Sequence, residues 1–213
     1  LYLCEADDPE RCDVELGRWI TPYPREGRWV HDVSPLLPLL AAGGTRRLAF
    51  YTQQPYRVAL DLRLSDAGRP TRPVAAHFLF AGGGFGPAYN DGRVPVTVAV
   101  PADAGRVLLA VAATGHGGVQ PGNCAEFCTT SHHFTVNGVE HVVQFDQPGD
   151  PEGCMRRADQ GTVPNQYGTW WYGRNGWCPG REVALLQLDV TADAPPGTDA
   201  VVSYRSLYQG AAY

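Results

Sequence analysis

The sequence predicts an all-β protein built from antiparallel jelly-roll sandwiches, and three observations support this expectation. Short apolar or alternating runs, bounded by Gly, Pro and Asp, recur at close intervals along the chain. In one of them, the apolar residues from Val58 to Leu64 alternate with Ala, Asp and Arg, as expected for a strand that turns one face toward a core. Helical periodicity is almost absent.

Nine such runs are expected to form strands, in chain order Leu48–Tyr51, Arg57–Leu64, Val74–Phe80, Val94–Val100, Arg106–Ala113, His133–Val136, His141–Phe145, Val183–Val190 and Ala200–Tyr204. Two turn sequences lie between runs, Asn90-Asp91-Gly92 and Asn137-Gly138, and the second is typical of a two-residue hairpin. The segment at 30–40, which contains Ser34-Pro35, is expected to hold the only helical turn.

A polar segment at residues 65–73 carries one glycine and two prolines and is the best candidate for a linker. We expect residues 1–66 to belong to an N-terminal jelly roll, 67–73 to form the linker and 74–213 to form a C-terminal jelly roll. The first part, at about 65 residues, is short for a whole sandwich, whereas about 140 residues suit one eight-stranded sandwich. The first jelly roll is therefore expected to be incomplete in this chain.

Charge and hydropathy exclude several classes of partner. The 213 residues carry a net charge of −5, and the 17 basic residues, all arginine, form no basic stripe. We therefore expect no nucleic-acid partner and no membrane partner. No apolar run approaches ~18 residues, the length that would indicate a membrane span. No signal peptide is recognisable, and strand-like sequence at both ends indicates a fragment or a processed chain.

The six cysteines fall into three close pairs, Cys4/Cys12, Cys124/Cys128 and Cys154/Cys178. An even count with local pairing is typical of disulfides in an oxidising compartment, so we expect a secreted or periplasmic protein. The alternative is a metal site. Since the spacings of three, seven and 23 intervening residues match no zinc pattern, disulfides are the favoured interpretation.

Two motifs beside cysteines carry groups that could act in a site. Glu126 lies inside Cys124-Ala-Glu-Phe-Cys128, where a disulfide would hold its carboxylate in place for substrate positioning or proton transfer. Arg174 begins the segment Arg-Asn-Gly-Trp-Cys, and its planar guanidinium suits an oxyanion or a carboxylate. The alternative is a disulfide-closed loop with a solvated glutamate.

A cluster of aromatic residues in the same Gly-rich stretch offers flat apolar faces on which sugar rings could stack: Trp170, Trp171, Tyr172 and Trp177. A position in a loop, rather than at alternating strand positions, favours a binding surface. The alternative is that these rings cap one end of the sandwich.

Four residues leave a copper site open as a further alternative: His116, His132, His133 and Met155. Imidazole and thioether groups are suitable ligands for copper. Two consecutive histidines would, however, point to opposite faces of one strand. The Gly-rich segment 82–86 is no phosphate loop, because no Gly-Lys-Ser/Thr follows it.

Taken together, these motifs resemble the peptide-N-glycosidase F family, whose members cleave the bond between the innermost N-acetylglucosamine of an N-glycan and the asparagine side-chain nitrogen. The matching pieces follow the family's order over most of the chain: Gly17-Arg-Trp-Ile-Thr-Pro-Tyr23, Phe50-Tyr-Thr52, Gly115-His116, Cys124-Ala-Glu-Phe-Cys128, Ser131-His132, Gly153-Cys154 and Gly176-Trp-Cys-Pro-Gly180. The cysteine-bounded pieces around Glu126 and Arg174 are the most specific.

The resemblance implies two jelly rolls side by side with the active site between them. It implies Cys124–Cys128 and Cys154–Cys178 disulfides. The first cysteine pair does not lie where the family's pair does, so a Cys4–Cys12 disulfide is expected to close a hairpin of the first domain.

For function, the resemblance implies an amidase that acts on an N-glycosylated peptide or glycan and needs no cofactor or metal. Glu126 and Arg174 would be its catalytic residues in this chain, with Glu126 holding the substrate. The residues expected to bind substrate are Trp177, Trp171, Trp170 and His116.

The sequence departs from the family's pattern at three places. The family's principal catalytic aspartate precedes the position that Leu1 matches, so this carboxylate is not in the sequence. Gln53 stands where the family has a glutamate, and Pro55 where it has a tryptophan. These departures leave two other functions open: a non-catalytic glycan- or glycopeptide-binding module of the same fold, and a copper-dependent monooxygenase of the peptidylglycine-hydroxylating type.

Overall fold

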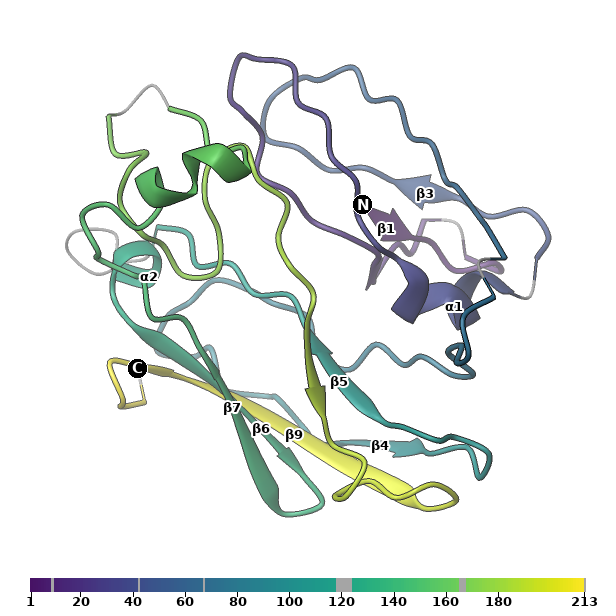
Figure 1. Cartoon of the computed structure of the whole chain (residues 1–213). Coiled ribbons are helices and arrows are strands. Elements are labelled where there is room, and N and C mark those ends of the chain that lie inside the picture. Colours follow the sequence, from purple (N-terminus) through teal and green to yellow (C-terminus); the bar gives the residue numbers. More distant parts are fainter. Residues whose placement is uncertain (9, 42, 67, 118–123, 165–167, 213) are drawn as a thin grey trace. The chain divides into compact units, whose positions relative to one another are not determined.

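The computed structural model describes residues 1–8, 10–41, 43–66, 68–117, 124–164 and 168–212, and the chain divides into two compact units. The first comprises Leu1–Gly17 and Asp32–Phe78, and the second comprises Arg18–His31 and Leu79–Tyr213. The described strands of each unit pair antiparallel and the helices are few and short, so the predicted all-β fold class is confirmed (Figure 1). The linker at 67–73, whose residue 67 lies outside the described ranges, stays a prediction, as does the side-by-side placement of two jelly rolls.

A small antiparallel sheet forms the ordered part of the first unit. Strand β1 (Tyr2–Leu3) lies between β2 (Val14–Glu15) and β3 (Leu48–Ala49). The Cys4–Cys12 disulfide closes the connection from β1 to β2. The helical turn expected at 30–40 is present as η1 (Ser34–Leu36) followed by α1 (Leu37–Ala41), with a proline in the first turn, where its missing N–H costs nothing.

Two of the nine expected strands are wrong. Neither 57–64 nor 74–80 is assigned as a strand, and the residues expected to face a core are exposed: Val58, Leu60, Leu62 and Leu64. Alternation shows that one face is apolar, but a strand also needs a neighbour to bond with. Among the described residues, no ladder includes these two runs.

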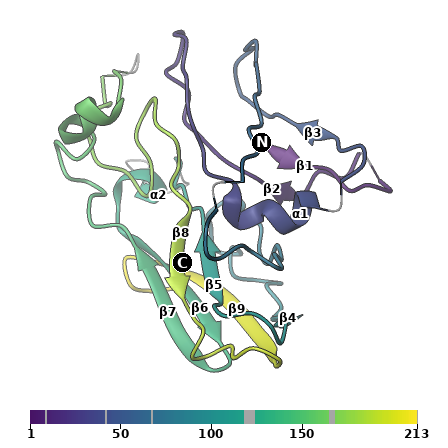
Figure 2. The same cartoon turned by 45° about the vertical axis from the view of Figure 1, so that its right-hand side comes forward.

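The second unit is built on a four-stranded antiparallel sheet of order β4-β9-β6-β7, comprising β4 (Val96–Ala99), β9 (Asp199–Tyr208), β6 (Thr130–Val136) and β7 (Val139–Gln144). A second pair consists of β5 (Leu108–Val111) and β8 (Leu186–Asp189), seen together in Figure 2. The β6–β7 connection is the expected hairpin, with positive φ at Asn137 (46°) and Gly138 (90°), as a type I′ turn requires.

The hydrophobic core of this unit lies between its two sheets, because its buried side chains come from both. Strand β5 contributes Leu109 and Val111, and β6 contributes Phe134 and Val136. Strand β9 alternates buried and exposed residues along most of its length, as expected for a strand with one face against a core. The core thus anchors the ends of β5, β6, β7 and β8, from which the site loops project.

Two further helical segments belong to this unit, so the expectation of a single helical turn is wrong. They are α2 (Cys124–Phe127) and the 3₁₀ helix η2 (Met155–Gln160). Both lie beside a disulfide-bonded cysteine and are too short for periodicity to reveal them. Among the described helices, none combines the length and the apolar character needed to cross a bilayer.

Candidate functional site

The acidic half of the site is the single turn α2, which precedes β6. A Cys124–Cys128 disulfide closes this turn, and the Cys128 N–H donates to the Cys124 carbonyl oxygen at 2.8 Å. Cys124 and Ala125 are buried, so they anchor the turn from inside. Glu126, on the same turn, has a side chain that is 14% exposed.

The basic half of the site is the loop at 168–180, attached to η2 by the Cys154–Cys178 disulfide. Gly176 allows this loop to pass close to neighbouring chain, because its φ is +79° and an added Cβ would clash with the Ala113 carbonyl oxygen. The Gly115 N–H donates to the Asn175 carbonyl oxygen at 2.9 Å, which holds the loop against the segment that follows β5.

The two halves meet in an ion pair between Glu126 and Arg174. The Nε–H of Arg174 donates to Oε1 of Glu126 at 2.6 Å, across 48 residues of sequence. The Arg174 side chain is only 1% exposed. The second carboxylate oxygen, Oε2, accepts a longer hydrogen bond of 3.3 Å from the Gly117 N–H. Glu126 is therefore held through one oxygen, while the other is only weakly engaged.

The remaining N–H groups of the Arg174 guanidinium are directed into its own loop. Nη1 donates to the carbonyl oxygens of Tyr172 (2.9 Å) and Trp170 (3.3 Å), and Nη2 donates to the carbonyl oxygen (2.8 Å) and hydroxyl (3.3 Å) of Thr169. All five donors thus have acceptors within the protein. In this conformation Arg174 binds a carboxylate, that of Glu126, and supports its own loop, with no N–H left over; its role toward a substrate stays a prediction.

Asn175 is a structural residue of the site that the sequence reasoning missed. It is 1% exposed, and its Nδ2 donates to the carbonyl oxygens of Ala125 (2.8 Å) and Cys128 (2.6 Å). Its backbone N–H donates to the Glu126 carbonyl oxygen at 3.0 Å. Asn175 therefore links α2 to the Arg174 loop. In the sequence, only its position next to Arg174 could have indicated this role.

Trp177 forms the buried base of the site, and the solvent-exposed side of the base is His116. Trp177 is 6% exposed, its Nε1–H donates to the Gly115 carbonyl oxygen at 2.5 Å, and the Arg174 guanidinium lies 4.7 Å from its ring. The His116 ring packs 4.3 Å from it. Desolvation by the groups packed against the ring, with the nearby Arg18 and Arg174 charges, lowers the pKa of His116 to about 4, so this imidazole is neutral near pH 7. The Trp177 ring presents little surface in this conformation, and the expected sugar contact through it stays a prediction.

The other two predicted aromatic residues lie at the outside of the loop. Trp170 and Trp171 pack edge to face with ring centroids 5.9 Å apart. Trp171 is 37% exposed and is the predicted sugar-binding residue that offers most surface. The structure thus brings Glu126, Arg174, Trp177 and His116 into one chain of contacts and leaves Trp171 as an outward-facing ring.

Two of the residues that kept a copper site open, His132 and His133, are engaged in other contacts. Nδ1 of His132 is hydrogen-bonded to the Tyr204 hydroxyl at 2.8 Å, and Nε2 of His133 to the Ser131 hydroxyl at 2.9 Å. Within the described ranges, no group of three or more His, Cys, Asp or Glu residues is placed to hold a metal ion.

Comparison with known families and proteins gives two matches over most of the chain. A model of the family described as peptide-N-glycosidase F, C terminal, matches residues 85–206. The peptide-N(4)-(N-acetyl-β-D-glucosaminyl)asparagine amidase F of Elizabethkingia miricola is 24% identical over 217 residues, which cover 90% of this chain and 57% of the relative. The chain thus spans just over half the length of that curated relative.

Solved structures are similar over a smaller part. A recombinant peptide:N-glycanase F (PNGase F) is 21% identical with a TM-score of 0.42, covering 55% of this chain and 36% of the other. A structure of PNGase F, described as a glycosylasparaginase from Flavobacterium meningosepticum, is 20% identical with a TM-score of 0.42. The match covers 56% of this chain and 39% of the other. These similarities are too low to define the fold, which follows from the chain's own strand pairing.

Proposed function

The chain belongs to the peptide-N-glycosidase F, C-terminal family, and from this premise we propose that it takes part in hydrolysing the amide link between an N-glycan and asparagine. The proposal is supported by the name of the Elizabethkingia miricola relative, an asparagine amidase that acts on an N-acetyl-glucosaminyl group. An N-glycosylated peptide is accordingly the proposed substrate.

The observation that carries the proposal is the Glu126–Arg174 pair. A carboxylate that receives a 2.6 Å charge-assisted hydrogen bond from a buried guanidinium cannot rotate away from its position. Disulfides lie on both sides of the pair, in α2 and in the Arg174 loop. Such preorganisation is expected where a substrate group must be held in one geometry while a bond is broken.

In the proposed reaction, water adds to the side-chain amide carbon and the C–N bond to the sugar-bearing nitrogen breaks, which leaves aspartate and a glycosylamine. The weakly engaged Oε2 of Glu126 would accept a hydrogen bond from the amide N–H or from a sugar hydroxyl. Arg174 would act by positioning Glu126 rather than by contacting the substrate.

The compartment is proposed to be oxidising, as in secretion or export to the periplasm. The structure contains three disulfides, and no described cysteine is free. Disulfides of this density are rare in a reducing cytosol. Glycoproteins, the proposed substrates, are found mainly outside the cytosol.

The test is the deglycosylation of a denatured N-glycopeptide by the full-length protein and its Glu126→Gln variant. Glutamine keeps the shape but removes the charge, and we expect the rate to fall by about 10²-fold, as for loss of one preorganised polar contact. Glu140→Gln on strand β7 is the matched control, because that carboxylate is exposed and lies at a sheet edge. Full activity in Glu126→Gln would remove the proposed role.

A second candidate function is a glycan-binding module without catalysis. It is favoured by Gln53 and Pro55, which replace two side chains of the family pattern and are exposed in the first unit. Binding of the protein to an array of N-glycans, with no product detected by mass spectrometry after prolonged incubation, would favour this function over the amidase.

A further inference from the structure

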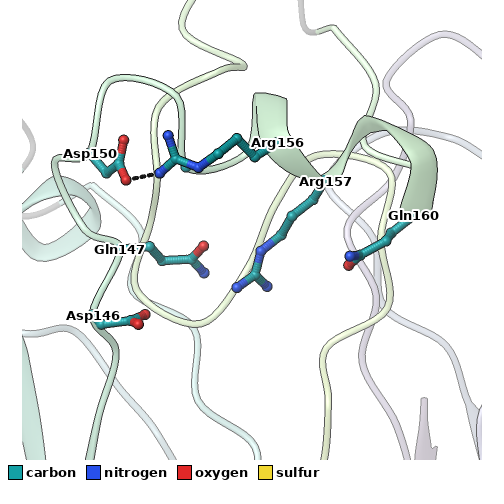
Figure 3. A pocket seen from close by; sticks show the side chains of 7 residues that line it. Asp146, Gln147, Asp150, Arg156, Arg157 and Gln160 are labelled. Carbon is teal, nitrogen blue, oxygen red and sulfur yellow. Dashed lines mark hydrogen bonds and ion pairs between the residues drawn. The ribbon is translucent and has the colours of Figure 1, made fainter.

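A polar pocket of about 320 Å³ lies between the loop that follows β7 and the helix η2 (Figure 3). It includes no residue of the Glu126–Arg174 pair or of its aromatic base. Six side chains line it: Asp146, Gln147, Asp150, Arg156, Arg157 and Gln160. Its volume lies at the small end of the range for ligand sites, roughly 300–1,000 Å³.

The amide of Gln147 points into this pocket without a hydrogen-bond partner. Gln147 is only 8% exposed, and among the described residues none bonds to its side chain. Figure 3 shows the amide directed toward the guanidinium of Arg157. The amide nitrogen and oxygen are not enclosed by protein atoms, so they are available to hydrogen-bond a ligand or water in the pocket.

The charges of the pocket indicate what kind of ligand it takes. Asp150 and Arg156 form an ion pair with each other and so compensate one another. This leaves the carboxylate of Asp146 and the guanidinium of Arg157, and in the described part of the chain neither forms an ion pair. A negatively charged ligand would be repelled by the Asp146 carboxylate, and a positively charged ligand would be repelled by the Arg157 guanidinium. A neutral polyol can instead donate to the first and accept from the second.

The walls of the pocket are held in place before any ligand binds. The N–H groups of Cys154 and Met155, at the start of η2, donate to the Trp171 carbonyl oxygen at 2.9 and 3.2 Å. In the loop after β7, the Gly149 N–H donates to the Gly173 carbonyl oxygen at 3.2 Å. The Cys154–Cys178 disulfide adds a covalent link. Binding would therefore require little ordering of the protein.

A second pocket of about 370 Å³ adjoins the first, because Gln160 lines both. Trp29 lines this second pocket, and its orientation is fixed by an Nε1–H donation to the Gly180 carbonyl oxygen at 2.9 Å and by stacking on Trp19. It therefore combines an aromatic side chain with polar neighbours. The two pockets together provide a place for a chain of sugars longer than one unit.

We infer that these adjoining pockets form a binding site for a neutral oligosaccharide, separate from the Glu126–Arg174 site. The inference goes beyond the proposed amidase function and does not depend on it, since the two sites share no side chain. In the first pocket, Asp146 and Arg157 bind hydroxyl groups of one sugar, with Gln147 and Gln160 completing its hydrogen bonds. Trp29 contacts the next sugar along the chain.

The test is a titration of the ¹⁵N-labelled 213-residue chain with a free, neutral high-mannose oligosaccharide, followed by NMR amide shifts. We expect Arg157→Ala and Gln160→Ala each to weaken binding by about tenfold. Arg205→Ala, an exposed arginine on strand β9, is the matched control and is expected to bind as the unmodified chain does. Because the ligand is uncharged, the affinity is expected to stay constant between about 0.05 and 0.5 M NaCl.

Three outcomes would overturn the inference. The first is no amide shift at millimolar oligosaccharide, or equal affinity in the Arg157→Ala variant. The second is displacement of the sugar by acetate together with a strong loss of affinity in salt, which would show an anion site. The third is loss of binding in Glu126→Gln with full binding in Arg157→Ala, which would place the sugar at the Glu126 site instead. Failure of the amidase proposal would leave these measurements unaffected.

Discussion

Replacing Arg174 by lysine separates a positioning role from direct contact with the substrate. The lysine keeps a positive charge at this position, and a positive charge is what direct contact with a substrate oxyanion would require. It has three donors in place of five, on a single nitrogen. One ammonium cannot reach both the Glu126 carboxylate and the carbonyl oxygens of Thr169 and Tyr172, which the guanidinium reaches through separate nitrogens.

The expected loss of stability follows from the hydrogen bonds that are left unmade. At least two buried acceptors lose their donor, and each costs about 1–3 kcal/mol. The total is about 2–6 kcal/mol, which includes the range measured when one partner of a buried ion pair is removed, about 3–5 kcal/mol. We therefore expect Arg174→Lys to lower the free energy of unfolding by about 3 kcal/mol.

The assay is urea unfolding followed by tryptophan fluorescence, since three of the five tryptophans lie in or beside the Arg174 loop. With a slope of about 1–3 kcal/mol per M urea, the midpoint should fall by about 1 M or more. Arg205→Lys is the control. Its ion pair with Glu140 is exposed and worth about 0–1 kcal/mol, so its midpoint should hardly move.

An Arg174→Lys variant that unfolds together with the Arg205→Lys control would refute this reasoning. It would mean that the five hydrogen bonds of Arg174 add little to the folded state. The side chain would then be free to turn toward a substrate, and its assignment as a positioning residue would be wrong.

Two further predictions concern the base of the site. Gly176→Ala should destabilise the protein by at least about 2 kcal/mol more than Gly138→Ala. Both positions have positive φ, but only at Gly176 would the added Cβ clash with the Ala113 carbonyl oxygen. Thermal unfolding of the two variants measures the difference, and equal losses of stability would contradict it. Stability should fall as the pH is lowered from about 6.5 to 4, because the unfolded chain protonates histidines that stay neutral in the folded state. His116→Phe should reduce this loss in urea titrations at several pH values, by less than its pKa shift alone would give because solvent screens the exposed ring. His132, whose pKa burial lowers to about 4, should account for part of what remains. An unchanged pH profile would argue against a neutral imidazole at 116.

Much of the second unit could be predicted from local sequence. Alternation and turn residues located all six described strands of this unit and also β3 of the first unit, and Asn137-Gly138 located a hairpin with both residues at positive φ. Two runs failed, at 57–64 and 74–80. Their own pattern is strand-like, but hydrogen-bonding partners decide whether a strand forms, and partners are not visible in a local pattern.

The sequence singled out residues that the structure brings into contact, and their roles toward a substrate stay predictions. Cysteine spacing singled out Glu126 and Arg174, and the structure brings them within 2.6 Å. Whether a guanidinium faces a substrate or its own loop depends on where neighbouring carbonyl oxygens point. In this chain five acceptors surround Arg174, and burial turns Trp177 inward.

By itself, then, the sequence determined the class of fold, the close cysteine pairs and the acidic and basic segments of the site, since each depends on residue type and near spacing. Tertiary structure alone decided that Asn175 joins the two segments, that Arg174 has no N–H left over, and that Gln147 is buried at a pocket without a partner. The physical reason is that hydrogen-bond satisfaction depends on the position and direction of groups brought together by folding across tens of residues.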